Sequence, residues 1–162
     1  MKLNAKQEEL LKLVNCIPPD LDEIAKMIKE NNFSSEDISI VGTAFVDNCF
    51  AEEIDDTDPE NWILLEPHGP YVYQIVELLL AFGLDPNYIL DSYNIMDELH
   101  FLEADYAAAD TLQRLIDHGG DVNLEVDGET VFEVIDFDVI FDALAQENRR
   151  RYDALLHCWF VL

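Results

Sequence analysis

Apolar residues recur every three or four positions along most of this chain, which is the spacing of one face of an α-helix. The first helix pair that this pattern predicts spans roughly residues 3–31, and Pro18-Pro19 separates its two helices. Asp20 and Glu23 stand three residues apart before the second apolar run, as in a capping box at a helix start. We therefore expect two amphipathic helices joined by a short turn at the beginning of the chain.

A second helix pair is predicted at roughly residues 35–82, and a long insertion divides it. Ser34 or Ser35 can cap its first helix. Its second helix, at 71–82, is apolar nearly all round, so we expect it to be the most buried helix of the molecule. Between the two helices, residues 52–70 are rich in acids and contain three prolines without a helical period, which indicates an acidic loop.

Two more helix pairs are predicted, at roughly residues 92–118 and 131–160, with Asp91 or Ser92 ahead of the first of them. A chain of 162 residues has room for one ordinary domain, and its 49% hydrophobic residues can supply a core. The pattern therefore predicts a single all-α domain, residues 1–162, built from about four stacked antiparallel helix pairs with one long acidic loop.

The ends of two predicted helices share a short motif. The order Gly-x-Asp-x-Asn occurs at 83–87 and again 36 residues later at 119–123. Self-similarity at such a period is the sequence signature of stacked repeats. The second copy continues into Asp127, Gly128 and Thr130, and this run resembles the ankyrin repeat. The resemblance implies a helical-repeat solenoid that serves as a binding scaffold, with a concave face and a row of loop tips.

The chain also departs from the ankyrin pattern. Residues 130–133 read Thr-Val-Phe-Glu where the family has Thr-Pro-Leu-His. The period is 36 residues, whereas the family's usual period is about 33 residues. The resemblance covers roughly residues 71–153, so the repeats are degenerate.

Charge is the most unusual feature of the composition. There are 35 Asp and Glu against nine Lys and Arg, which gives a formal net charge of −26. Residues 30–113 contain 19 carboxylates and no Lys or Arg, so their field extends into solvent instead of being neutralised by neighbours. Such a surface opposes binding to bare nucleic acid or to an anionic membrane. It favours a protein partner with a basic surface.

The sequence predicts an intracellular, cytoplasmic protein without a membrane span. The N-terminal residues lack the apolar core of a signal peptide, and the three cysteines form no CxxC pair. No uninterrupted apolar run approaches the length that a membrane helix needs.

Candidate chemistry is weak along the whole chain. The acids of the loop could be imagined as calcium ligands, but the loop lacks the glycine and the distal glutamate of an EF-hand. His157 and Cys158 are adjacent on a predicted helix and so point apart, which argues against a nucleophilic dyad. No glycine-rich phosphate loop is present. We therefore expect no catalytic residue, no metal site, no cofactor and no enzymatic activity.

Two functional classes remain. In the first, the protein is an adaptor or inhibitor, a non-catalytic interaction module whose acidity selects a basic protein partner. In the second, its carboxylates imitate the regular charge of a nucleic acid, so that it antagonises a nucleic-acid-binding protein, as in phage counter-defence or toxin immunity. The acidity could also serve solubility alone. We favour the first class.

The candidate partner-binding residues combine acids with one aromatic side chain. Trp62 follows six acids and precedes an apolar segment that suits a short strand, so it either contacts a partner or anchors the loop, and we favour the anchor. The candidates are Asp55, Asp56, Asp58, Glu60, Trp62, Asp91, Asp97 and Glu98.

Overall fold

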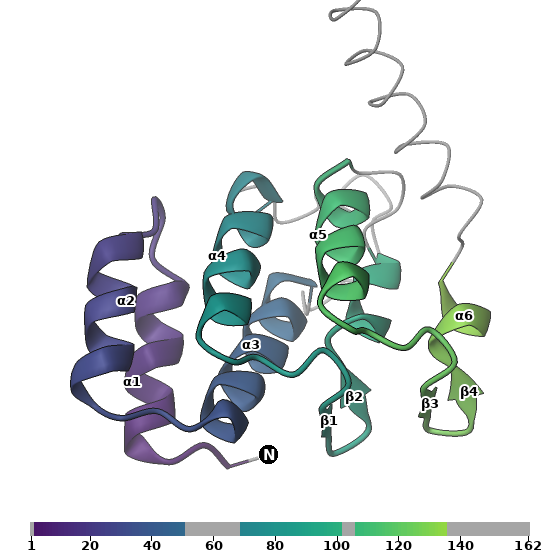
Figure 1. Cartoon of the computed structure of the whole chain (residues 1–162), viewed down its shortest axis with the longest axis horizontal. Helices are drawn as coiled ribbons and strands as arrows, with labels where there is room; N and C mark the ends of the chain where they lie inside the picture. The colour runs from purple at the N-terminus through teal and green to yellow at the C-terminus, as the bar shows by residue number, and fades with distance from the viewer. Residues whose placement is uncertain (1, 51–68, 102–105, 136–162) are drawn as a thin grey trace, which may run out of the picture.

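The computed structural model describes residues 2–50, 69–101 and 106–135. These residues are mostly helical, and they also form two small antiparallel sheets (Figure 1). The helices are α1 Ala5–Val14, α2 Leu21–Glu30, α3 Ser35–Phe50, α4 Gly69–Ala81, the 3₁₀ helix η2 Asp97–Phe101, α5 Tyr106–Asp117 and α6 Val131–Val134. The strands are β1 Ile89–Leu90, β2 Tyr93–Asn94, β3 Glu125–Val126 and β4 Glu129–Thr130. The predicted loop, except for its last two residues, lies outside the described residues.

Local capping fixes where the early helices begin, as the sequence indicates. The Asp20 side chain accepts a hydrogen bond from the Glu23 N–H at 3.0 Å, which caps α2. The Ser34 hydroxyl accepts one from the Asp37 N–H at 3.0 Å, and the Asp37 carboxylate accepts one from the Ser34 N–H at 3.0 Å. Of the two predicted caps of α3, Ser34 is therefore the one used.

The prediction of an all-α fold is wrong at two places, residues 89–94 and residues 125–130, each of which forms a small antiparallel sheet. We expected Asp91 or Ser92 to begin a helix, but these two residues form the turn of the hairpin β1–β2. Asn94 is fully buried, and its amide donates to the carbonyls of Pro86 at 2.9 Å and Tyr88 at 3.0 Å. Hydrogen bonds of this kind offer the backbone an alternative to a helix, and only the short η2 follows.

The second hairpin, β3–β4, turns at Asp127-Gly128, where the sequence predicts a tight turn. Both residues have a positive φ, 53° and 89°, as a two-residue hairpin turn of type I′ requires. Thr130 and Glu133 form the predicted capping box at the start of α6. The helix ends at Val134 because Ile135 is extended, so the expected helix pair at 131–160 is described only for this single turn.

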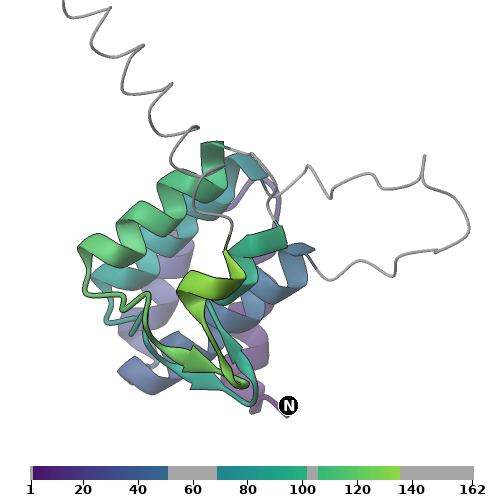
Figure 2. The ribbon, with the colours of Figure 1, turned by 90° about the vertical axis from the view of Figure 1, so that its right-hand side faces the viewer.

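The helices lie in two rows (Figures 1 and 2). Along the first row α1 packs on α3, α3 on η2, and η2 on α6. Along the second row α2 packs on α4, and α4 on α5. Both hairpins project from the same edge of the molecule, the lower edge in Figure 1, and follow each other along its long axis. The fold therefore presents the two hairpins as neighbours on one side.

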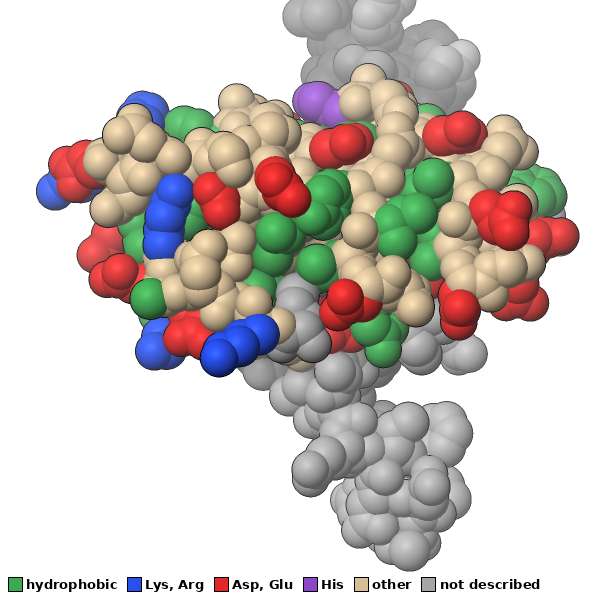
Figure 3. All heavy atoms as spheres, turned by 90° about the horizontal axis from the view of Figure 1, so that it is seen from below, with side chains coloured by type: hydrophobic (Ala, Val, Ile, Leu, Met, Phe, Trp, Pro, Cys, Tyr) green, Lys and Arg blue, Asp and Glu red, His purple; other side chains and the backbone are tan. Residues whose placement is uncertain are grey.

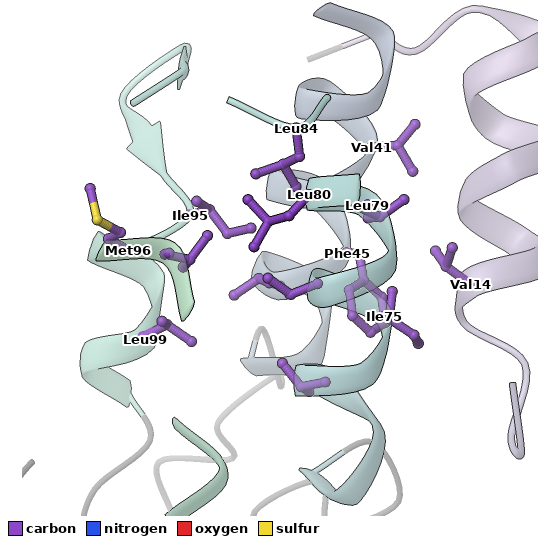
Figure 4. Packing of buried hydrophobic residues seen from close by; sticks show 14 of the residues in the cluster. Val14, Val41, Phe45, Ile75, Leu79, Leu80, Leu84, Ile95, Met96 and Leu99 are labelled. Carbon is purple, nitrogen blue, oxygen red and sulfur yellow. The ribbon is translucent and has the colours of Figure 1, made fainter. Parts of the chain in front are cut away.

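The core fills the space between the two rows (Figure 4). Leu79 of α4 has no exposed surface, as predicted, and it lies close to Phe45 and Val41 of α3. The expectation that α4 is the most buried helix is wrong, however. Six successive residues of α3, 41–46, are all buried, whereas Glu77 of α4 is exposed. Both helices contact three others, α3 with α1, α4 and η2 and α4 with α2, α3 and α5, but α4 keeps an exposed side at Glu77.

The two Gly-x-Asp-x-Asn segments, at 83–87 and 119–123, fold alike. Both glycines adopt the left-handed conformation that ends a helix, with φ of 100° and 95°. In both segments the Asp side chain accepts a hydrogen bond from the N–H of the following Asn at 2.9 Å. The hairpins match as well, since each residue pair of β1–β2 has its counterpart 36 residues later in β3–β4. The sequence motif thus marks a repeated structural unit.

Asn87 connects the first of these turns to the second. Its side-chain amide donates to the Gly119 carbonyl at 2.9 Å, and its Oδ1 accepts from the Asp121 N–H at 2.7 Å. One side chain therefore satisfies backbone groups of the next unit and fixes the spacing between the two hairpins.

Candidate functional site

The predicted site residues fall into two groups. Asp55, Asp56, Asp58, Glu60 and Trp62 lie outside the described residues, so their role and the anchoring of Trp62 stay predictions. The structure places the other three, Asp91, Asp97 and Glu98, on or directly after the first hairpin.

These three acids have different environments. Asp91 is exposed in the turn between β1 and β2, where its φ is 54°. Asp97 and Glu98 open η2, where Asp97 is half-buried and Glu98 is only 4% exposed. A partner can therefore contact Asp91 directly, whereas almost none of Glu98 is exposed to a partner.

Glu98 is a correction to the predicted site. Burial, the negative charges of Asp47 and Asp97, and a hydrogen bond with Asp47 together raise its pKa to about 7. A carboxyl group that is buried, and about half protonated at pH 7, cannot act as an exposed anion for a basic partner. Sequence spacing gave no sign of this pair, because its members lie on separate elements, α3 and η2.

The exposed surface next to Asp91 is the hairpin side of the molecule. Figure 3 views this side, with hydrophobic side chains along its middle, carboxylates beside them and Lys side chains towards the α1–α2 end. Ile89 and Tyr93 of the first hairpin are 41% and 48% exposed. Sequence reasoning missed both residues because it assigned their segment to a connection and a helix.

Acids occupy equivalent positions of the two units. Asp85 and Asp91 of the first unit correspond to Asp121 and Asp127 of the second, each pair 36 residues apart. All four residues are exposed. We call the exposed part of the two turns and hairpins the hairpin surface: Asp85, Ile89, Asp91, Tyr93, Asp121, Glu125, Asp127 and Glu129.

The two hairpins have the same strand pairing but expose different side chains. Where the first presents Ile89 and Tyr93, the second presents Glu125 and Glu129 at the positions 36 residues later. The exposed strand side chains are therefore apolar and aromatic in the first hairpin and acidic in the second, while both turns carry an exposed acid, Asp91 or Asp127. Aromatic side chains beside complementary charges are typical of protein recognition sites.

Few cations lie near these carboxylates. From residue 31 to residue 135 the chain contains a single Lys or Arg, Arg114. Its guanidinium binds Glu77 at 2.6 Å and Asp110 at 3.2 Å, and it stacks over Tyr73. Arg114 therefore joins α4 to α5 in the second row, and its charge is already paired there.

An open hollow of about 380 Å³ lies between α1 and α2, at the other end of the rows. Lys12, Lys26, Glu9 and Glu23 mix both charges on its walls. No three His, Cys, Asp or Glu side chains gather as a metal site within residues 2–50, 69–101 and 106–135. In the same ranges, no helix has the length and apolar character that crossing a bilayer demands.

Comparisons with protein-family models, with curated proteins and with solved structures give no significant match to this chain.

Proposed function

We propose that this protein is a non-catalytic interaction module, an ankyrin-like helical solenoid that binds a basic protein partner through its hairpin surface. The repeated turns, the matching hairpins and the Asn87 bridge support a stacked-unit architecture. The observation that carries the proposal is the pairing of an exposed apolar tip, Ile89 and Tyr93, with exposed acids at equivalent positions of consecutive units.

The charge distribution favours a cationic partner. The carboxylates of the hairpin surface lie in a segment whose one Lys or Arg, Arg114, binds Glu77 and Asp110 on other elements. A basic surface would gain complementary charge there, and the long-range field would speed its approach. The apolar tip would supply buried area, which contributes more to lifetime than exposed charges do.

The order of the two tips defines the partner further. A partner segment that lies along both hairpins meets Ile89 and Tyr93 beside Asp91 first, and carboxylates without an apolar neighbour of this kind next. The best match is a segment in which an apolar anchor is followed by Lys or Arg.

A neutralised hairpin surface tests this proposal. Asp91→Asn and Asp127→Asn suit the turns, because Asn also adopts a left-handed conformation readily. Combined with Glu125→Gln and Glu129→Gln, they remove four charges from exposed positions. A matched control removes four exposed charges from α1 and α2: Glu8→Gln, Glu9→Gln, Asp22→Asn and Glu23→Gln.

The measurement has two stages. The wild-type chain is used to capture a partner from cell extract, and the purified partner is then titrated against each variant at 50 and 500 mM salt. The hairpin variant should bind at least ten times more weakly at low salt, and the control should bind within about threefold of wild type. Equal losses in both variants would show that general charge, and not the hairpin surface, carries binding.

The second candidate function, nucleic-acid mimicry, has one observation in its favour. Asp85 and Asp121, and likewise Asp91 and Asp127, repeat in register on one side, as charges along a nucleic acid do. Under mimicry the partner binds nucleic acid, and duplex DNA added to the complex should displace this protein. An ordinary basic partner would leave the complex intact at the same DNA concentration.

A further inference from the structure

A buried pair of carboxyl groups joins the first row of helices. Glu98 of η2 is 4% exposed and hydrogen-bonds to Asp47, a half-buried residue near the end of α3. Both elements are in direct contact, and η2 also contacts β2 of the first hairpin. A change in this pair therefore acts where α3 supports the hairpin surface.

The surroundings of Glu98 disfavour its charged form. The charges of Asp47 on α3 and Asp97 on η2 both act against ionisation. On the neighbouring β2 the titratable side chain is Tyr93, which is exposed, and on α6 it is Glu133, which is bonded to Thr130. Residues 31–113 contain no Lys or Arg that could compensate a new negative charge.

We propose that Glu98 is a proton-controlled latch: protonated, it holds η2 and the β1–β2 hairpin against α3, and ionised, it loosens them. The ionised form places a second negative charge beside Asp47 in a space almost closed to solvent. Two carboxylates in hydrogen-bond range repel each other, whereas a carboxylic acid and a carboxylate share one proton.

The direction of the pH effect follows from linkage. The pKa of Glu98 is raised to about 7 in the folded chain, from 4.5 for an unperturbed glutamate. Below pH 4.5 the group is protonated in both states and costs nothing. Between pH 4.5 and pH 7, the equilibrium constant for closing η2 against α3 falls by up to about tenfold for each pH unit. Above pH 7 the group is ionised in both states, so the constant changes little.

Other shifted groups titrate outside this window. The pKa of Asp37 is held at about 2, because hydrogen bonds from Ser34, Gln7 and Lys6 outweigh the effect of its partial burial. Burial raises the pKa of the Cys49 thiol to about 12. Histidines ordinarily titrate within this window, and His100 lies on η2 itself. A change between pH 5.5 and pH 8 is therefore assigned to Glu98 only where Glu98→Gln removes it.

Hydrogen exchange of the full chain tests the latch. The Leu99 amide reports on η2, because it donates to the Met96 carbonyl at 3.2 Å. The Met96 amide reports on the junction between β2 and η2, because it donates to Asn94 Oδ1 at 2.9 Å. After correction for intrinsic exchange, their protection in the wild type should fall at least tenfold from pH 5.5 to pH 8. Glu98→Gln should change less than twofold, and the exposed control Glu125→Gln should behave as wild type.

Two further results keep the test decisive. If Glu98→Gln does not fold, Asp47→Asn replaces it and should reduce the pH dependence, because one of the two charges is gone. A directly measured Glu98 pKa below 5, or an equal pH response in wild type and Glu98→Gln, would overturn the latch.

The latch bears on partner binding only through the proposed function, since it acts on the hairpin that carries Tyr93 and Asp91. The exchange measurement uses no partner. A failed latch therefore shows in protection factors, and a failed interaction site shows in retained binding by the neutralised hairpin variant.

Discussion

Asn87 connects two consecutive turns, although the sequence motif places it in the first of them. Its side chain spans from one turn to the next and bonds both a carbonyl and an N–H of the following unit. Its counterpart Asn123 bonds within its own turn, to the Asp121 carboxylate at 3.3 Å. Within the described residues, which end at 135, these two Asn residues of one motif therefore differ in what they connect.

Asn87→Ala should lower the free energy of unfolding by about 1 to 3 kcal/mol, because two backbone groups of the next turn lose their partner. Asn123→Ala should cost clearly less. Urea denaturation followed by circular dichroism measures both changes. Equal costs for the two variants would contradict a bridging role for Asn87.

Helical periodicity in the sequence predicts some helices of this chain correctly and others wrongly. Helical periodicity around residues 92–102 predicts a full helix, but the chain folds into a hairpin and the short η2. The buried Asn94 bonds three neighbouring backbone groups, those of Pro86, Tyr88 and Met96, and so commits the segment to the turn. At α4 the periodicity is decisive, because its apolar side chains pack between α2, α3 and α5.

Leu79→Ala tests this packing within one element. Leu79 is fully buried in the core, so the substitution should cost about 2 to 5 kcal/mol through lost burial and the cavity left behind. Its neighbour Leu78 is only partly buried, and Leu78→Ala should cost less than half as much. Thermal and urea denaturation provide the values. A cost below about 1 kcal/mol for Leu79→Ala would contradict the central place of α4 in the core.

At the scale of the whole molecule, charge is distributed along the rows. Five of the nine basic residues lie within the first 30 residues, which form α1 and α2. Lys6 contacts the Asp37 carboxylate at 3.3 Å and the Phe33 ring at 4.2 Å, and so ties this pair to α3. The hairpin end keeps its excess of carboxylates, and the net charge of −26 opposes compaction.

Salt should therefore stabilise the fold. Raising KCl from 10 to 500 mM shortens the Debye length from about 30 Å to less than 8 Å and weakens the repulsion among the carboxylates. We expect the melting temperature to rise by several degrees, and to rise less in the neutralised hairpin variant. Sucrose of equal osmolality controls for solvent effects. A melting temperature that falls with KCl would mean that ion pairs outweigh repulsion.

The sequence by itself determined the features that depend on near neighbours. The capping of α2 at Asp20, the capping box at Thr130 and the turn at Asp127-Gly128 each need interactions only a few residues apart. The same holds for the repeated motif, because a left-handed glycine and an Asp side chain complete each turn locally.

The tertiary structure alone decided which distant residues meet. Glu98 hydrogen-bonds to Asp47 because α3 and η2 pack together, and this contact turned a predicted surface acid into a buried one. Tyr93 became part of the hairpin surface because the buried Asn94 beside it is bonded inwards. Burial and charge coupling are properties of assembled elements, so a pattern of near neighbours does not contain them.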